Sequence, residues 1–140
     1  MKTRFFSLLA VVLCLSLAAC GGGGGTAIVL PTLTGAWGGQ HIGLTISDAG
    51  ASLAYDCAHG TIDGQIHLDQ GGRFSVTGVH IIDQPGPTTP GATINSHPAR
   101  YDGQVQQDSL SLTVTLTDTG QNVGTFLLTR NGTAQVFACV

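Results

Sequence analysis

The sequence is short of charged residues, and of basic ones in particular. It contains no glutamate and a single lysine, Lys2, and its formal net charge is −3 with neutral histidines. Beyond residue 20 the only Lys or Arg residues are Arg73, Arg100 and Arg130, which face eight aspartates, so this part carries a net charge of −5. Nucleic-acid binding needs a basic face for the phosphates, and adsorption to anionic lipid needs clustered Lys or Arg. The composition therefore argues against both.

Signatures of catalysis are also missing from the sequence. It has no Gly-x-Ser-x-Gly nucleophile elbow, and its glycine run at 21–25 is not placed between a strand and a helix as a phosphate loop would be. Asp56 and Asp63 could be written as an acid–base pair, but glycosidase chemistry needs a defined carboxylate separation inside a cleft. Nothing in the sequence supports that geometry. We therefore expect a protein that is not an enzyme and holds no cofactor.

The N-terminus has the pattern of an export signal. Residues 1–4 are basic, residues 5–17 are almost wholly apolar, and small residues follow. The apolar run is shorter than the roughly 20 residues that a membrane-spanning helix needs. Leu17-Ala18-Ala19-Cys20 resembles the lipobox of bacterial lipoproteins. This resemblance implies cleavage before Cys20 and a lipid anchor on that cysteine, a thioether diacylglycerol with an N-acyl chain such as palmitate. The alternative is an ordinary cleaved signal followed by a chance cysteine.

These motifs predict a domain organisation and a location. We expect a signal peptide over 1–19, a lipidated cysteine with a Gly-rich tether over 20–30, and one domain over 31–140. A flexible Gly-rich tether of ten residues spans roughly 17 Å, which keeps the domain close to its membrane. Glycine instead of aspartate at position 21 favours outer-membrane sorting in lipoproteins of Gram-negative bacteria. The expected location is the cell envelope, facing the periplasm at the outer membrane, with the membrane bound through the lipid.

Two of the four cysteines remain for the folded domain. Cys14 lies in the signal, and Cys20 is the expected lipid site. Cys57 and Cys139 form an even pair in an oxidising compartment, which predicts a disulfide. Closing a loop of about 80 residues contributes about 4–5 kcal/mol in the chain-entropy model. The alternative is a pair of reactive or metal-binding thiols.

Alternating hydrophobicity predicts an all-β fold. Residues 40–47 and 109–117 alternate apolar with polar side chains, which is typical of half-buried strands, and turn residues separate such runs. No sustained helical period follows the signal. The predicted strands span residues 40–47, 51–57, 61–69, 73–82, 99–106, 109–118, 123–130 and 134–140. We expect a single small antiparallel eight-stranded meander, closed or nearly closed into a β-barrel, because closure hides the strand edges.

One long connection interrupts the strands. Residues 83–98 are rich in Pro and Gly and show no periodicity, and loops beyond about 12–15 residues are uncommon in compact domains and often functional. Two interpretations stay open. The segment is either a crossover between two halves of the meander or a binding loop across one barrel mouth.

Two weaker family resemblances bear on function. Thr34-Gly35-Ala36-Trp37 resembles the Gly-x-Trp start of calycins, which carry small apolar ligands. This resemblance implies an internal pocket and a contact between Trp37 and Arg130. A lone Trp that closes the bottom of any barrel would give the same pattern, and the chain has few aromatic residues to line a pocket.

The second resemblance is to the membrane-bound inhibitors of c-type lysozyme, small periplasmic β-barrel lipoproteins. It rests on residues 54–60, residues 96–103 and the late Cys139, which match a Tyr-x-Cys, a Ser-Gly-x-Arg-Tyr loop and a disulfide cysteine. The resemblance places Ser96, Arg100 and Tyr101 on an inhibitory loop. Three residues separate Ser and Arg here instead of two, and the basic lysine of that family is missing. With His97 these residues form a possible partner-binding loop for an envelope protein.

The five histidines do not predict a metal site. His41, His59, His67, His80 and His97 lack the spacing of helical or zinc-type ligands. His41 and His67 fall opposite the apolar positions and are expected to face solvent. His59 with Asp56 and Asp63 is the best local cluster, interpreted as a turn histidine that bonds to backbone.

Taken together, the sequence predicts a lipid-anchored, non-enzymatic binding or structural module of the cell envelope. The alternatives are an inhibitor of c-type lysozyme and a calycin-like carrier.

Overall fold

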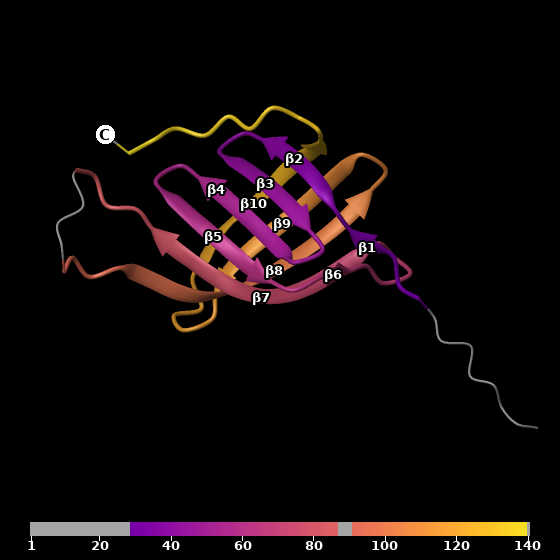
Figure 1. The fold of residues 1–140 in the computed structure, drawn as a ribbon, viewed down its shortest axis with the longest axis horizontal. Helices are drawn as coiled ribbons and strands as arrows, with labels where there is room; N and C mark the ends of the chain where they lie inside the picture. The colour runs from indigo at the N-terminus through magenta and orange to yellow at the C-terminus, as the bar shows by residue number, and fades with distance from the viewer. Residues whose placement is uncertain (1–28, 87–90, 140) are drawn as a thin grey trace, which may run out of the picture.

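The chain folds into a closed antiparallel β-barrel (Figure 1). The structure, a computed structural model, describes residues 29–86 and 91–139, and this part contains no helix and therefore none that could cross a membrane. Eight strands close in the order β10-β2-β3-β4-β5-β7-β8-β9, with every neighbouring pair antiparallel. The predicted all-β fold and its barrel closure are confirmed. The signal peptide, Cys20 and the glycine run lie outside the described residues.

The strands have the following bounds. They are β1 (Thr32–Leu33), β2 (Gly35–Gly39), β3 (Ile42–Ser47), β4 (Gly50–Tyr55), β5 (Ala58–Asp63), β6 (Ile66–His67), β7 (Arg73–Ile82), β8 (Asn95–Gln106), β9 (Ser109–Leu116) and β10 (Asn122–Arg130). β1 and β6 form a separate two-stranded sheet.

Some of the predicted strand positions are wrong, although the number of barrel strands is right. β2 was not predicted, because Gly-Ala-Trp-Gly-Gly has no β-branched residue and little alternation. The predicted strand at 134–140 is absent: residues 131–139 leave the barrel wall, and only Gln135 makes a bridge, to Gln40. β8 begins at Asn95, so the long connection is residues 83–94.

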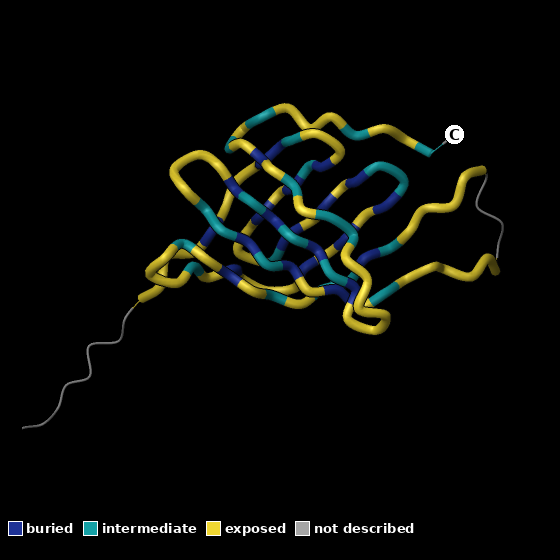
Figure 2. The backbone as a smooth tube through the Cα atoms, turned by 180° about the vertical axis from the view of Figure 1, so that it is seen from behind, coloured by how far each residue is buried: buried dark blue, intermediate teal, exposed yellow. Residues whose placement is uncertain are grey.

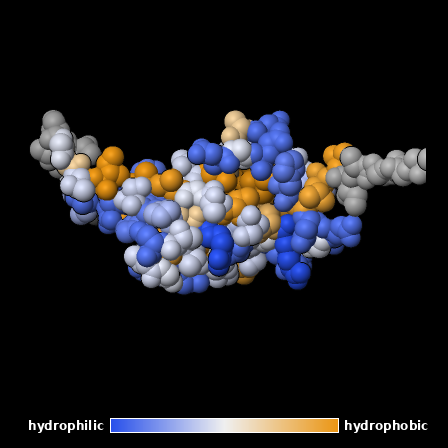
Figure 3. Space-filling view, turned by 90° about the horizontal axis from the view of Figure 1, so that it is seen from below, coloured by the Kyte–Doolittle hydropathy of each residue, from blue (hydrophilic) through white to orange (hydrophobic). Residues whose placement is uncertain are grey.

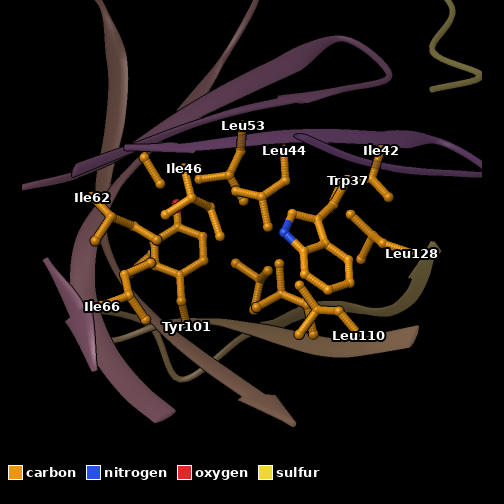
Figure 4. Close-up of a cluster of buried hydrophobic side chains, with 14 of the residues drawn as sticks. Trp37, Ile42, Leu44, Ile46, Leu53, Ile62, Ile66, Tyr101, Leu110 and Leu128 are labelled. Carbon is orange, nitrogen blue, oxygen red and sulfur yellow. The ribbon is translucent and has the colours of Figure 1, made fainter. Parts of the chain in front are cut away.

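Large side chains fill the barrel (Figure 4). Trp37 and Tyr101 are 2% and 0% exposed and lie among leucines and isoleucines from the surrounding strands. Buried and exposed positions alternate along the strands (Figure 2). Gly60 makes room for Tyr101, since a Cβ there would lie 2.5 Å from the Tyr101 hydroxyl. Gly103 does the same for the Phe74 ring. The inward-facing glycines and the aromatic rings are therefore complementary, and the barrel has a packed core.

The barrel has two unlike ends. The N-terminal end carries residues 29–34, the β3–β4 and β8–β9 turns, and the β1–β6 sheet, whose Leu33 and Ile66 are buried. The loop end carries the β2–β3 and β4–β5 turns, the connection 83–94 and the β9–β10 connection. Figure 1 shows β1 and the end of β7 at opposite sides of the molecule.

A C-terminal strap, residues 131–139, returns along the outside of β2 and β3 to the loop end. Gln135 donates its N–H to the Gly39 carbonyl (3.0 Å) and accepts from the N–H of His41 (2.8 Å). A Cβ on Gly43 would lie 2.8 Å from that of Ala134, so the missing side chain allows the strap to dock. A disulfide joins Cys57 to Cys139, with 4.9 Å between their Cα atoms. The predicted cysteine pairing is confirmed.

Candidate functional site

Four of the five histidines gather at the loop end, although they are far apart in sequence. His41 lies in the β2–β3 turn, His59 at the start of β5, His80 near the end of β7, and His97 near the start of β8. His80 and His97 are cross-strand partners. The up-and-down order of the strands produces this grouping, because it returns the chain to the same end after every second strand. His67 lies instead on β6 at the N-terminal end and is exposed, as expected.

Three of these histidines pair with aspartates. The imidazole Nδ1 atoms of His41, His59 and His97 lie 2.5, 2.8 and 2.7 Å from carboxylate oxygens of Asp56, Asp83 and Asp118, in that order. His97 also contacts the Asn95 side chain through Nε2, at 2.9 Å.

The predicted cluster of His59 with Asp56 and Asp63 is wrong. Asp56 lies in the β4–β5 turn and pairs with His41 across to the next turn. Asp63 is the last residue of the six-residue strand β5 and lies at the opposite end of the barrel. His59 faces outward from the start of β5 and meets Asp83, which follows β7, so it bonds to a carboxylate and not to backbone.

The carboxyl groups in two of these pairs have lowered pKa values. For Asp56 the main cause is the hydrogen bond from the backbone N–H of Phe137, to which His41 adds, against partial desolvation. For Asp118 the hydrogen bond from His97 is the main cause, again against partial desolvation. Both groups are therefore anionic acceptors at neutral pH, and the Asp56 contact fixes the strap to the loop end.

Beneath this polar surface lies a buried pair of rings. His80 is 3% exposed, and its ring centroid lies 5.2 Å from that of Tyr55. Among the described residues, neither His80 Nδ1 nor the Tyr55 hydroxyl has a hydrogen-bond partner. Desolvation lowers the pKa of His80, and the nearby His97 and His59 lower it further, so the imidazole is held neutral.

Tyr101 lies deeper and is fully paired. Its hydroxyl donates to the Val79 carbonyl at 2.8 Å, and burial raises its pKa to about 12. A Tyr101 that is 0% exposed cannot touch a partner in this conformation.

The residues expected to form a partner-binding loop lie on strand β8. Ser96 and Arg100 face outward, whereas His97 and Tyr101 are on the inward side. Arg100 donates through Nε to Asp102 at 2.8 Å. The residues that the lysozyme-inhibitor resemblance assigns to a single loop therefore lie on opposite faces of a strand. The alternation of these residues in the sequence could have indicated which face each one occupies. The predicted strand began only at residue 99, so Ser96 and His97 were assigned to the connection instead.

The projecting hairpin at the loop end carries exposed apolar side chains. This β7–β8 arm, residues 81–86 and 91–95, includes Ile82 and Ile94, which are 39% and 71% exposed. Figure 3 shows apolar residues gathered beside the end of this hairpin. A cleft of about 560 Å³ lies in the arm, lined by isoleucines 81, 82 and 94, Pro85, and the His59–Asp83 pair among others. Residues 87–90 are outside the described part of the chain and are not included in this site.

A contact at the other end of the barrel matches the Gly-x-Trp expectation. Arg130 is the cross-strand partner of Trp37, and its guanidinium carbon lies 4.3 Å from the centroid of the indole. Arg130 also donates to the Thr34 carbonyl (3.3 Å). The contact seals the N-terminal end of a filled barrel.

The described residues of the loop end do not provide the donor set of a metal centre. Within the ranges 29–86 and 91–139, no group of three or more His, Cys, Asp or Glu side chains is placed to hold a metal ion. Comparisons of the chain with known protein families, with curated proteins and with solved structures found no match.

Proposed function

We propose that the protein is a lipid-anchored module of the cell envelope that binds a protein partner through the β7–β8 arm, with the barrel as a rigid scaffold. The lipobox-like Cys20 and the short tether would hold the N-terminal end near the membrane. The loop end, on the opposite side of the barrel, would then face away from the membrane and toward a partner.

The observation that carries this proposal is the exposure of Ile82 and Ile94 around the cleft of the arm. A β-hairpin that only connects two strands has no need of large exposed apolar side chains next to its strand ends, and apolar groups gathered on a surface often mark interaction sites. The His59–Asp83 pair borders the same cleft. An apolar centre with a polar rim has the anatomy of a protein–protein interface.

The packed interior supports a surface-binding role over a carrier role. Inward positions hold Trp37, Tyr101 and Phe74, and the rings of Tyr101 and Phe74 occupy the space beside the inward-facing glycines. A carrier of small apolar ligands would need to expel such groups. A filled barrel instead provides a stiff base that presents its loops in a fixed arrangement.

The test is affinity capture with the full-length lipidated protein from detergent-solubilised envelopes, followed by binding measurements with the purified partner. We expect one recurrent protein that is lost with Ile82→Ser/Ile94→Ser. Leu127→Ser is the matched control, because Leu127 is 75% exposed on β10, away from the arm. Equal binding by the double variant and the control would reject the arm as the binding surface.

The anchor is tested in the same preparation. Cys20→Ser should move the protein from the membrane fraction to the soluble fraction, and Cys14→Ser should leave it in the membrane. A Cys20→Ser protein that stays membrane-bound and carries an acyl chain would contradict lipidation at that residue.

A further inference from the structure

A second groove crosses the outer face of β7, β8 and β9, away from the arm. Its volume is about 630 Å³, within the range of ligand sites. Leu30, His67 and Asp69 border the groove, and its remaining lining contains two rows of outward side chains that the strand register sets beside each other. One row is Ser75, Asp102 and Thr113, and the other is Arg73, Gln104 and Ser111. The backbone of the Phe74–Gly103 pair lies between the rows and forms the floor, while the Phe74 ring points into the core.

The polar groups of this groove are held in place by neighbours. Asp102 accepts hydrogen bonds from the Ser75 hydroxyl (2.6 Å) and from Arg100 (2.8 Å). Partial desolvation opposes ionisation of Asp102, but these two hydrogen bonds and the Arg100 charge lower its pKa overall. At the β7 side of the groove, Asp69 accepts from the backbone N–H groups of Gly71 and Arg73, both at 2.8 Å. The groove therefore presents ordered, ionised acceptors.

The chemistry of the lining excludes several classes of ligand. Asp69 and Asp102 outweigh Arg73, so the groove has no excess of positive charge for a phosphate or a nucleic acid. Of its lining residues only Leu30 and Phe74 are large and apolar, and the Phe74 ring is buried in the core, which leaves too little apolar surface for a lipid chain. The floor belongs to paired strands, so its backbone groups are already used and a peptide cannot add as another strand.

After these exclusions, the feature of the groove that can bind a ligand is its set of side-chain hydrogen-bond donors and acceptors. Carboxylates and hydroxyls accept, while guanidinium, amide and hydroxyl groups donate. Sugar hydroxyl groups do both. We propose that the groove between the two rows binds a neutral carbohydrate chain that lies across strands β7 to β9. This site is separate from the arm, so the barrel would hold a glycan at its side and a protein at its loop end.

The experiment is isothermal titration calorimetry of the full-length protein in detergent micelles. The probes are chitotetraose, cellotetraose and maltotetraose, which separate an N-acetylated amino-sugar chain from plain β- and α-linked glucans. Inorganic phosphate is a fourth probe. We expect saturable binding of at least one tetrasaccharide and none of phosphate.

Two variants of β8 locate the binding. Gln104→Trp places a large ring in the groove and should weaken sugar binding by about tenfold or more. Gln106→Trp is the matched control, because it changes an outward side chain two residues along the same strand, outside the groove lining, and should bind as the unmodified protein does. Circular dichroism confirms that both fold. Absence of binding to all three sugars, or equal binding by the two variants, would overturn the proposal, as would preferential binding of phosphate.

Discussion

Tyr101 shows how single residues shape this barrel. Its ring occupies the space left by Gly60 and Gly78, because a Cβ on Gly78 would lie 3.1 Å from the ring. Its hydroxyl then reaches the Val79 carbonyl, which lies on the neighbouring strand. This packing of a large aromatic side chain against glycines fills the interior of the barrel between β5, β7 and β8.

The Gly60–Tyr101 contact predicts a stability change. Gly60→Ala should lower the free energy of unfolding by about 1–3 kcal/mol, since added atoms in a packed core force side chains out of place. Urea unfolding followed by tryptophan fluorescence measures it. In a Tyr101→Phe background the hydroxyl oxygen nearest the new methyl group is missing, so the same substitution should be less destabilising. An equal loss in both backgrounds would contradict the contact with the hydroxyl.

At the scale of elements, the C-terminal strap packs on the barrel wall but is not one of its strands. It covers the outside of β2 and β3, where Gly38 and Gly43 are cross-strand partners without side chains. The Asp56 contact to the Phe137 N–H and the Cys57–Cys139 disulfide hold its far end. The strap therefore depends on the backbone hydrogen bonds of Gln135 and on the bonds at its end more than on burial of Phe137, which remains 65% exposed.

Breaking the disulfide should destabilise the whole domain. The bridge spans 82 residues, and removing such a cross-link from a small domain costs about 2–5 kcal/mol. We expect Cys139→Ser, and the Cys57→Ser/Cys139→Ser double variant, to lower the free energy of unfolding by similar amounts. Reduction of the unmodified protein with dithiothreitol should have the same effect. Unchanged unfolding after confirmed reduction would show that the disulfide adds nothing to stability.

At the scale of the whole molecule, the ionisable groups of the loop end favour folding at neutral pH. The pKa of His80 in the folded protein is below its ordinary value of 6.5. Its contribution to the free energy of unfolding is therefore complete above pH 6.5 and is lost as the pH falls below that value. Asp56 and Asp118 also have lowered pKa values, so their contributions are complete above pH 3.8 and are lost at lower pH. Acid therefore weakens the fold in two successive ranges.

The His80 part of this behaviour can be isolated. The group is surrounded by Tyr55, His59, His97 and Asp83. His80→Leu removes a buried nitrogen without a partner, so stability at pH 7.5 should change little, whereas the loss of stability between pH 6.5 and 5 should become smaller. Urea unfolding at four pH values measures this, with His67→Gln as the surface control. An unchanged slope in the His80→Leu protein would mean that His80 does not link stability to pH.

A feature of this protein was predictable from the sequence only where a local pattern or a count of residues determines it. β3, β7 and β9 were predictable, because a half-buried strand exposes every second residue and its sequence therefore alternates polar with apolar residues. The Cys57–Cys139 pair was predictable by elimination. β2 was not, because its Gly-rich segment shows little alternation and is held by the strap on its outer face and by the burial of its own Trp37 in the core. The His–Asp pairs were not either, since each joins residues that only the barrel brings together.

By itself, the sequence determined the fold class, the disulfide and the signals that predict a lipid anchor, because each of these depends on local patterns or on a count of residues. The tertiary structure decided which residues share a surface. It placed Tyr101 in the core, collected four histidines at the end opposite the β1–β6 sheet, and set two polar rows beside each other across β7, β8 and β9. The physical reason is the register of antiparallel strands, which local patterning leaves open and only the packing of the whole barrel selects.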